Sequence, residues 1–266
     1  MFAAAAVALG FLLLPIVAIF ARVSPAKLVA QLSHPVVTDA LVLSLKTSAI
    51  AQALVVLLGT PAAYLIATRR FPGRSLAVVL VELPLVLPPA VAGIGLIATF
   101  GRFGLLGGTL NAFGIRLGLT QAAVVIAVAY VASPLYVRQA IAAFEAVDPD
   151  LVAASRTLGA GRTRTFFRVV LPLARRGLAA GEALSFARGL GEFGATIMFA
   201  GSLQKVTQTL PLAIYAEFEV NFDVTLAISA LLVLISAALL ISLKLTSLWQ
   251  PSEQISPSRF ARLTWS

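Results

Sequence analysis

Long apolar runs alternate with short polar intervals along the chain. A helix needs about 20 apolar residues to cross the hydrocarbon core of a bilayer. Six runs are long enough: 2–21, 40–68, 76–100, 121–141, 178–200 and 224–245. The pattern predicts an all-α polytopic membrane protein in which residues 1–248 form one membrane domain and residues 249–266 a short tail. Because no basic leader precedes the first run, we interpret it as a retained span rather than a signal peptide.

The third run is interrupted by Pro84, Pro88 and Pro89. Proline breaks or bends a helix and frees backbone carbonyls, which only protein or water can satisfy inside a membrane. We therefore expect Pro88 and Pro89 to face the interior of the bundle. The glycine-rich interval 101–119, which follows this run, predicts either a plain loop or a partly re-entrant segment, and the loop is the simpler interpretation.

The longest polar interval, residues 144–172, is also strongly basic. Asp148 and Pro149 predict a helix start, because aspartate caps free amides and proline suits the first helical position. Gly159 and Gly161 predict a corner between two short helices. A small helix of this kind, lying across the ends of membrane helices, would present a knob to a soluble partner.

Composition supports the membrane assignment, since 59% of the 266 residues are hydrophobic and the mean hydropathy is +0.97. The chain has no cysteine and a single histidine, His34, which excludes disulfides and leaves no metal site. The net charge of +9 does not indicate nucleic acid, because the cations lie in short loops between apolar runs.

Basic residues in the loops predict the orientation. Nine arginines lie in the 69–74 turn and the 144–176 connection, against five lysines and arginines in the connections on the other side. Because positive loops stay inside, we expect both dense clusters and both termini in the cytoplasm of a bacterial or archaeal plasma membrane.

The chain lacks the motifs of soluble catalysis. It has no phosphate-binding loop, no G-x-S-x-G and no H-E-x-x-H, so we expect no catalytic residue and no ATP hydrolysis by this chain. Energy for transport would come from an ion gradient or from another subunit.

The sequence Ala153-Ala154-Ser155-Arg156-Thr157-Leu158-Gly159, followed by Val169-Val170-Leu171-Pro172, resembles the signature of binding-protein-dependent ABC-transporter permeases. The spacing agrees, but Ala153 replaces the usual glutamate, Ser155 an alanine and Val169 an isoleucine. The resemblance implies a coupling helix that docks on an ATPase. The residues that would couple are Leu151, Ala153, Ala154, Ser155, Arg156, Thr157, Leu158, Gly159, Ala160 and Arg162. The alternative is that Gly159 only ends a helix and the arginines only fix orientation.

Residues 186–201 and 207–215 are similar to those of molybdate/tungstate permeases, and sulfate/thiosulfate permeases share the Gly-Glu-Phe-Gly core at 191–194. This resemblance implies an importer of a tetrahedral oxyanion, most closely molybdate or tungstate, that works by alternating access. The partners it implies are a second permease copy, two ATPase subunits that use ATP and Mg, an extracytoplasmic binding protein and membrane lipid. No cofactor would be bound by this chain.

Arg188 and Glu192 lie one helical turn apart in an apolar run, where isolated charges are costly. The simpler interpretation is that the two side chains pair with each other for structural reasons. The more specific interpretation is that they line or gate the permeation route. Ser185 and Thr196 would then add hydroxyl groups to that route, and backbone amides near Pro88 and Pro89 would line it too. The nearby glycines Gly189, Gly191 and Gly194 indicate close helix packing.

Four other polar residues lie in or near apolar runs. Glu82 and Lys46 could each neutralise a charge on a neighbouring span, and Arg175 or Arg176 could balance Glu182. His34 is expected to be a solvated loop residue.

Two other classes remain open. An ion-coupled secondary transporter would require Glu192 or Glu82 as an ion site and would tolerate bulk at Gly159. An intramembrane enzyme would need a nucleophile with its base, or a metal, and the composition makes this a poor interpretation.

Overall fold

The computed structural model describes residues 2–248, with side chains to residue 242. Within this range every regular element is a helix, which confirms the all-α prediction. The predicted tail, 249–266, lies outside the described residues. The helices are α1 Phe2–Arg22, α2 Pro25–Gln31, α3 Pro35–Thr68, α4 Arg74–Val86, α5 Pro89–Phe100, α6 Gly107–Ala112, α7 Gln121–Glu145, α8 Pro149–Thr157, α9 Arg162–Thr165, the π-helix η1 Phe166–Val170, α10 Leu171–Leu190, α11 Gly194–Ala200, α12 Leu210–Glu217 and α13 Phe222–Leu248.

Among the described residues, four helices, α1, α3, α7 and α13, are long and apolar enough to cross a membrane. The pair α4–α5 makes a fifth candidate that is bent by 113°. The bend follows Val86 and coincides with Pro88 and Pro89, as the prolines predicted. Both prolines are exposed in this chain, so the prediction that they face the interior of the bundle is wrong; the helices packed on α5 cover residues further along it, such as Ala92 and Leu96.

The run expected as a fifth continuous span is also interrupted. Helix α10 ends at Leu190, and α11 begins only at Gly194. Helix α10 carries four charged side chains and is therefore more polar than the four long apolar helices. With α4–α5 and α10–α11 each taken as one broken span, the expected number of about six is consistent with the structure.

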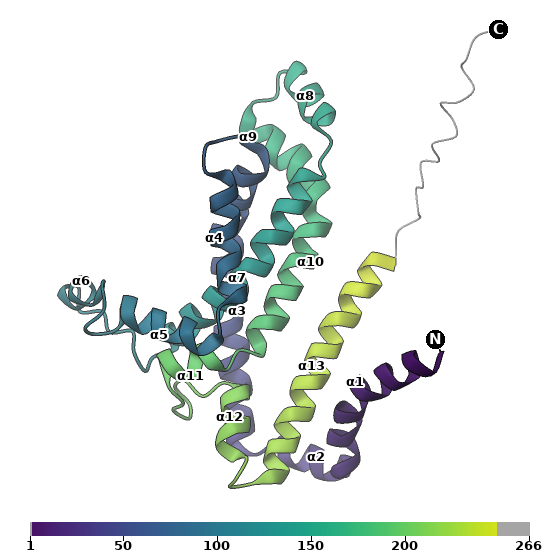
Figure 1. Ribbon diagram of the computed structural model, residues 1–266, viewed down its shortest axis with the longest axis vertical. Helices are drawn as coiled ribbons and strands as arrows, with labels where there is room; N and C mark the ends of the chain where they lie inside the picture. Colours follow the sequence, from purple (N-terminus) through teal and green to yellow (C-terminus); the bar gives the residue numbers. More distant parts are fainter. Residues whose placement is uncertain (1, 249–266) are drawn as a thin grey trace.

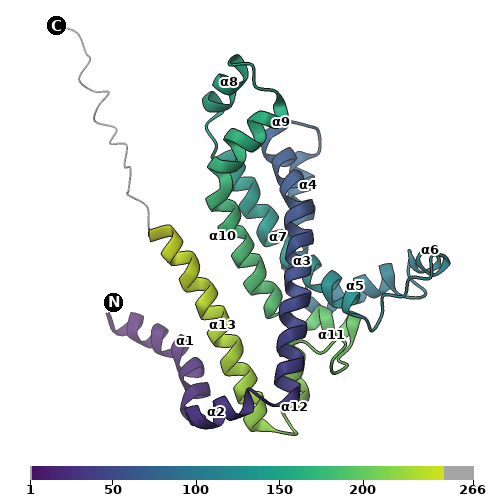
Figure 2. The same cartoon turned by 180° about the vertical axis from the view of Figure 1, so that it is seen from behind.

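Helices α3, α7 and α10 lie side by side and form the centre of the bundle (Figures 1 and 2). One core cluster joins α3, α5, α7 and α11 around Val124 and Phe199, and a second joins α3, α7 and α10 around Tyr136 and Phe144. A third cluster packs α12 and α13 against the start of α3. Short helices α8 and α9 form one end of the molecule, and α2 and α12 gather at the other (Figure 1).

Helix α10 does not begin with a regular α-helical turn. The π-helix η1, Phe166–Val170, connects α9 to α10 without a break in the helical backbone. A π-helical turn holds one more residue than the α-helical turns beside it, and such turns are frequent at functional sites.

Candidate functional site

Two short helices meet at a glycine corner in the basic segment, as predicted. The Asp148 carboxylate accepts a hydrogen bond from the Asp150 amide at 2.8 Å, and Pro149 occupies the first position of α8. Gly159 has a φ of +82°, a left-handed conformation that favours glycine. Gly161 then precedes α9.

The two helices are linked by side chains as well as by the corner. The hydroxyl groups of Ser155 in α8 and Thr165 in α9 lie 3.1 Å apart, within hydrogen-bond distance. The Ala160 amide donates to the Ser155 carbonyl at 3.1 Å, which closes the end of α8. The corner is therefore held by backbone and side-chain bonds together.

Most of the coupling residues that the sequence predicted are exposed, and α8 has no buried residue. Leu158 is 88% exposed at the tip of the segment. Exposed large apolar side chains at the tip of a small helix indicate a contact surface rather than a core. The structure brings these residues together on one projecting segment (Figure 1).

Beneath α8 lies an open pocket of about 640 Å³ whose lining includes Arg70, Glu145, Ala153 and Arg156. Ala153 stands where the signature that this segment resembles usually has glutamate. The absence of a carboxylate there leaves Arg70 and Arg156 on the pocket wall, and neither forms an ion pair within the described residues.

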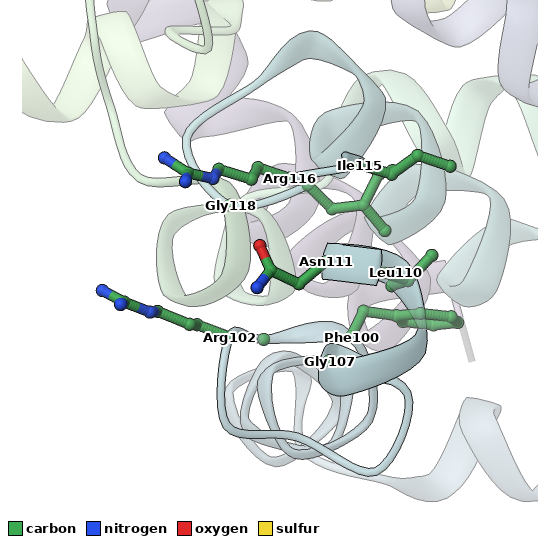
Figure 3. A pocket seen from close by; sticks show the side chains of 10 residues that line it. Phe100, Arg102, Gly107, Leu110, Asn111, Ile115, Arg116 and Gly118 are labelled. Atoms are coloured by element: carbon green, nitrogen blue, oxygen red, sulfur yellow. The ribbon is translucent and has the colours of Figure 1, made fainter. Parts of the chain in front are cut away.

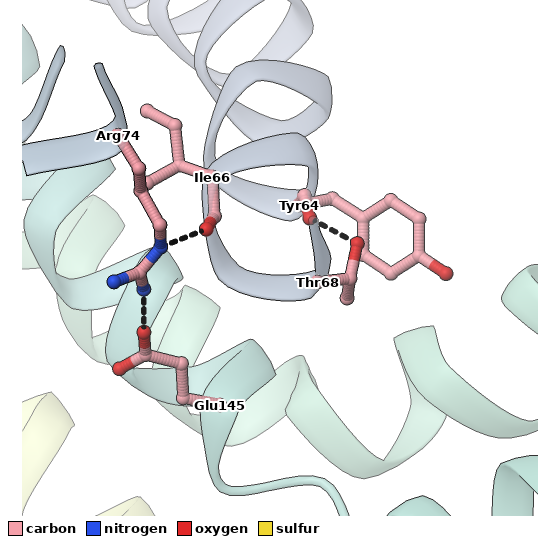
Figure 4. Close-up of polar contacts among 5 residues, drawn as sticks. All are labelled: Tyr64, Ile66, Thr68, Arg74 and Glu145. Atoms are coloured by element: carbon pink, nitrogen blue, oxygen red, sulfur yellow. Dashed lines mark hydrogen bonds and ion pairs between the residues drawn. The ribbon is translucent and has the colours of Figure 1, made fainter. Parts of the chain in front are cut away.

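Arg74 ties this end of the bundle together (Figure 4). Its Nε donates to the Ile66 carbonyl at 2.8 Å, and its guanidinium pairs with the Glu145 carboxylate. Three helices, α3, α4 and α7, are thereby joined at the end that carries the basic segment. The two basic clusters, 69–74 and 144–176, do lie at the same end of the molecule.

Aromatic packing extends this junction toward α8 and α9. The Tyr64 ring lies edge-on to Phe144, with centroids 5.3 Å apart, and to Phe166, with centroids 4.8 Å apart. These three rings come from α3, α7 and η1. They connect the foot of the projecting segment to the centre of the bundle.

Arg188 and Glu192 form an ion pair with 2.7 Å between Nη1 and Oε2. The other carboxylate oxygen, Oε1, accepts a hydrogen bond from the Ala195 amide at 2.8 Å. Glu192 therefore binds Arg188 before the break and the first turn of α11 after it. The structural pairing expected from the sequence is present.

Ser185 is fully buried between helices α3, α7 and α10. Its hydroxyl donates toward the Gln52 side-chain oxygen at 3.0 Å and the Ala132 carbonyl at 2.9 Å. Gly189 explains the close approach, because a Cβ there would come within 2.9 Å of Val128. Gln52 was not among the predicted site residues, although a glutamine in the middle of an apolar run is a signal of a buried polar contact.

Pro89 and Thr196 belong to a separate contact between α5 and α11. A Cβ on Gly194 would come within 2.6 Å of the Pro89 Cβ. The Thr196 hydroxyl is buried with no hydrogen-bond partner among the described residues. The predicted pathway residues thus separate in the structure. Pro89 and Thr196 belong to the two helices of this contact, Pro88 precedes α5, Arg188 and Glu192 lie at the α10–α11 break, and Ser185 is buried where α10 meets α3 and α7.

The remaining membrane charges are partly as expected. Glu82 pairs with Arg138 of the neighbouring helix α7 at 3.4 Å. Lys46 instead donates to an amide, the Gln121 side-chain oxygen, at 2.9 Å. Gly191 has no neighbour across a helix interface in the described range, unlike Gly189 and Gly194.

The expected balance of Glu182 by Arg175 or Arg176 is not present. Within residues 2–242 no ion pair involves Glu182, and its Oε2 is buried without a hydrogen-bond partner. The physical reason is helical geometry, because side chains six or seven residues apart lie almost two turns away from each other along α10. His34 is half-buried and starts α3, with its Nδ1 buried and unbonded in the same range, rather than fully solvated.

The interval 101–119 contains α6 and a pocket of about 220 Å³ (Figure 3). Arg102 and Arg116 extend in the same direction on either side of the Asn111 side chain. A Cβ on Gly107 would come within 2.3 Å of the Gly101 carbonyl, so glycine is required for this tight turn. The interval is a loop with a short helix.

A family model described as "Binding-protein-dependent transport system inner membrane component" matches residues 55–248. The chain belongs to this family. The match begins in the middle of α3 and covers the projecting segment and every later helix. The suspected ABC-permease resemblance is thereby confirmed.

Relatives of this permease from bacteria and archaea are described more narrowly. The chain is 44% identical over 229 residues to the "Molybdenum transport system permease protein ModB" of Mycobacterium tuberculosis, across 85% of this chain and 86% of that protein. It is 39% identical over 249 residues to the "Probable molybdenum ABC transporter permease protein" of Haloferax volcanii, across 92% and 90%.

Solved transporters share the permease fold. The crystal structure of a bacterial ABC transporter involved in import of the acidic polysaccharide alginate has a TM-score of 0.67 at 14% identity, covering 85% of this chain and 83% of that chain. The inward-facing MetNI methionine ABC transporter gives 0.59 at 20% identity, covering 84% and 97%. At these identities the likeness concerns the fold alone.

The relatives are transport permeases, and the described part of this permease has no group of three or more metal-ligating side chains.

Proposed function

We propose that this permease is the membrane subunit of an ATP-driven importer for a tetrahedral oxyanion, with molybdate as its substrate and tungstate as the related ion. The observation that carries the proposal is the 44% identity to a molybdenum transport permease over 85% of the chain. Residues 1–248 would act as one permease domain. The ATP and Mg would be used by a separate ATPase, since no phosphate-binding loop is present in the sequence.

The projecting segment is proposed to dock on that ATPase. Residues 151–162 are mostly exposed, and Leu158 at the tip offers an apolar anchor in a segment that also carries Arg156 and Arg162. An exposed apolar side chain within a charged rim is a common arrangement for a protein interface. Ala153 removes one carboxylate from this surface, and the neighbouring Arg70 and Arg156 suit an acidic group on the ATPase.

Movement of the segment would be passed to the bundle through packed contacts. The Tyr64, Phe144 and Phe166 rings and the Arg74–Glu145 pair connect it to α3, α4 and α7. Rigid, packed elements of this kind can transmit a small displacement as a concerted shift. We infer alternating access as the mechanism, with the basic end and both termini in the cytoplasm.

The proposed pathway uses the broken helices. Pro89 lies against Gly194 where α5 meets α11, Pro88 precedes it, and the unbonded Thr196 hydroxyl of α11 can serve a passing anion. Arg188 and Glu192 are assigned to holding the α10–α11 break, and Ser185 to fixing α10 against α3. The partners are a second permease copy, two ATPase subunits, an extracytoplasmic oxyanion-binding protein and lipid, and not nucleic acid.

The test is uptake by the complete transporter in liposomes. Permease, ATPase and binding protein are reconstituted together, and ATP-dependent uptake of molybdate, tungstate and sulfate is measured. We expect molybdate and tungstate to accumulate and sulfate to accumulate much less. Accumulation of sulfate alone, or uptake driven by an ion gradient without ATP, would overturn the proposal.

The coupling role is tested by Gly159→Trp. The left-handed backbone disfavours any side chain by roughly 1–2 kcal/mol, and the bulk lies on the proposed docking surface. We expect ATP hydrolysis to persist while uptake is lost. Gly10→Trp is the matched control, because a Cβ on Gly10 meets nothing within 4 Å and α1 has no buried residue. Normal uptake by Gly159→Trp would remove the segment from the mechanism.

A further inference from the structure

Lys46 is a charged residue on a membrane-spanning helix, in a position that the proposed function does not use. Its ammonium donates to the Gln121 side-chain oxygen at 2.9 Å, which joins α3 to the first residue of α7. A lysine within a span is costly unless it faces water or a partner. The Gln121 oxygen is thereby occupied, and the amide nitrogen of the same side chain remains as a donor.

The loop between α11 and α12, residues 201–209, is fixed against the same face of α3. The Gln204 amide donates to the Asp39 carboxylate at 3.1 Å, and the Leu210 amide donates to the Ser44 hydroxyl at 2.8 Å. Inside the loop the Leu203 carbonyl accepts from three amides, and Thr207 is fully buried. The loop is therefore a rigid platform beside Lys46.

Lys205 stands on this platform in a strained conformation. Its φ is +67°, and Leu119, two residues before Gln121, has a φ of +59°. Left-handed conformations are uncommon for residues other than glycine, and they persist where the surrounding structure imposes them, often at functional sites. Two such residues on facing segments indicate that the placement of Lys205 near Gln121 is imposed by the fold.

Lys46, Gln121 and Lys205 line one open pocket of about 530 Å³, together with Asp39 and the hydroxyl-bearing Thr38. The Asp39 carboxylate is held by Gln204, and neither lysine forms an ion pair within the described residues. The pocket therefore carries a net positive charge and several unused N–H donors. The oxygen atoms of a dianion accept hydrogen bonds from donors of this kind, and the positive charge strengthens those bonds.

We propose that this pocket is a tetrahedral-dianion site that receives the oxyanion at the outer mouth of the permease before it enters the pathway. The inference rests on the proposed function. The ammonium groups of Lys46 and Lys205 are carried by flexible side chains in an open pocket. They attract the anion without enclosing it. Such a site captures an anion and releases it again, which conduction requires.

The test uses the reconstituted complete transporter with Lys46→Gln and Lys205→Gln combined. Clefts of one charge sign raise the rate of ion capture by about 10-fold or more, so we expect molybdate uptake to fall by roughly 10-fold and to lose its dependence on ionic strength. The combined Lys46→Arg and Lys205→Arg variant keeps both charges and should retain most of the uptake. Lys205→Gln alone, on an exposed loop, covers the case in which the double variant does not fold.

The matched control is Arg22→Gln with Lys27→Gln. It removes the same charge from the residues that precede α3, where neither side chain lines the pocket. We expect wild-type uptake from this control.

If the wild-type transporter takes up no oxyanion, the proposed function fails. If wild type transports and the Lys46 and Lys205 variants match the control, only the pocket inference is overturned. Sulfate, added as competitor, should inhibit the wild type more than the double variant if the site selects by charge and shape.

Discussion

At the scale of single residues, Glu192 is the one charged side chain among residues 2–242 that the fold buries almost completely. Its side chain is 1% exposed and bonds Arg188 with one oxygen and the Ala195 amide with the other. Burial of an ionised carboxylate is tolerated only when its oxygens are satisfied in this way. Glu192 therefore secures the break between α10 and α11.

We predict that Glu192→Ala lowers the free energy of unfolding by about 2 kcal/mol, because it leaves a buried amide and a half-buried guanidinium without their acceptor. Glu192→Gln keeps an oxygen for the Ala195 amide and should cost less. The measurement is thermal unfolding of the purified protein in detergent. Equal losses for the two variants would contradict the capping role.

Arg74 is a second residue whose role depends on two bonds at once (Figure 4). We predict that Arg74→Ala lowers the free energy of unfolding by about 1–2 kcal/mol, since it removes a hydrogen bond to the Ile66 carbonyl and a partly exposed ion pair with Glu145. Arg74→Lys keeps the charge but cannot make both bonds and should be intermediate. The matched control Arg69→Ala, at an exposed arginine of the same turn, should stay within about 0.5 kcal/mol.

Sequence spacing was sufficient to predict some of these residue pairs. Arg188 and Glu192 are four residues apart on one helix, so their pairing follows from helical geometry alone. The bond from Glu192 to the Ala195 amide could not be predicted, because it exists only where the helix stops. The Lys46–Gln121 bond joins residues 75 positions apart, and nothing local in the sequence brings those helices together.

At the scale of elements, the interrupted helices α4–α5 and α10–α11 meet through α5 and α11. A Cβ on Gly93 would come within 2.6 Å of the Met198 Cβ, so the two helices approach too closely for any larger residue. Small residues allow such backbone contact between membrane helices. The contact holds two broken spans against each other.

We predict that Gly93→Ala destabilises the protein by about 1–3 kcal/mol, because the added methyl group forces α5 away from α11. Gly95→Ala on the same helix is the matched control. Its Cβ would meet nothing within 4 Å, and alanine favours the helix over glycine by about 1 kcal/mol, so we expect no loss. Thermal midpoints of both variants measured side by side check the prediction, which is wrong if the two midpoints agree.

The sequence predicts the break between α4 and α5 better than the break between α10 and α11. Consecutive prolines at 88 and 89 predict an interruption of the helix, and α4 and α5 are bent by 113° at this point. The break after Leu190 is marked only by glycines, which helices in membranes also use for packing. Gly189 does pack against α7, whereas Gly191 marks the break, and the sequence alone does not separate these uses.

At the scale of the whole molecule, the fold separates two ends. One carries the basic turn, α8 and α9, and the other carries α2, α12 and the start of α13 (Figures 1 and 2). The sequence could predict this division, because the arginines cluster in two connections that helix counting puts on one side. The lateral order of the helices depended on side-chain packing and could not be predicted.

The absence of cysteine allows a direct test of orientation. We predict that single cysteines at Thr163 and Pro72 react with a membrane-impermeant thiol reagent only in inverted vesicles. Single cysteines at Ser33 and Glu219, exposed residues of the opposite end, should react only in right-side-out vesicles. The unmodified chain, which has no thiol, serves as the control. Labelling of Thr163→Cys from outside would reverse the assigned topology.

The π-helical turn Phe166–Val170 gives this region an unusual tolerance of shortening. Losing a single residue from a continuous α-helix swings everything beyond it through about 100°. Within a π turn, the same loss leaves an ordinary α turn, with the flanking stretches still in phase. Deletion of one residue here, such as the exposed Phe167, would therefore keep α8 and α9 in their orientation relative to α10.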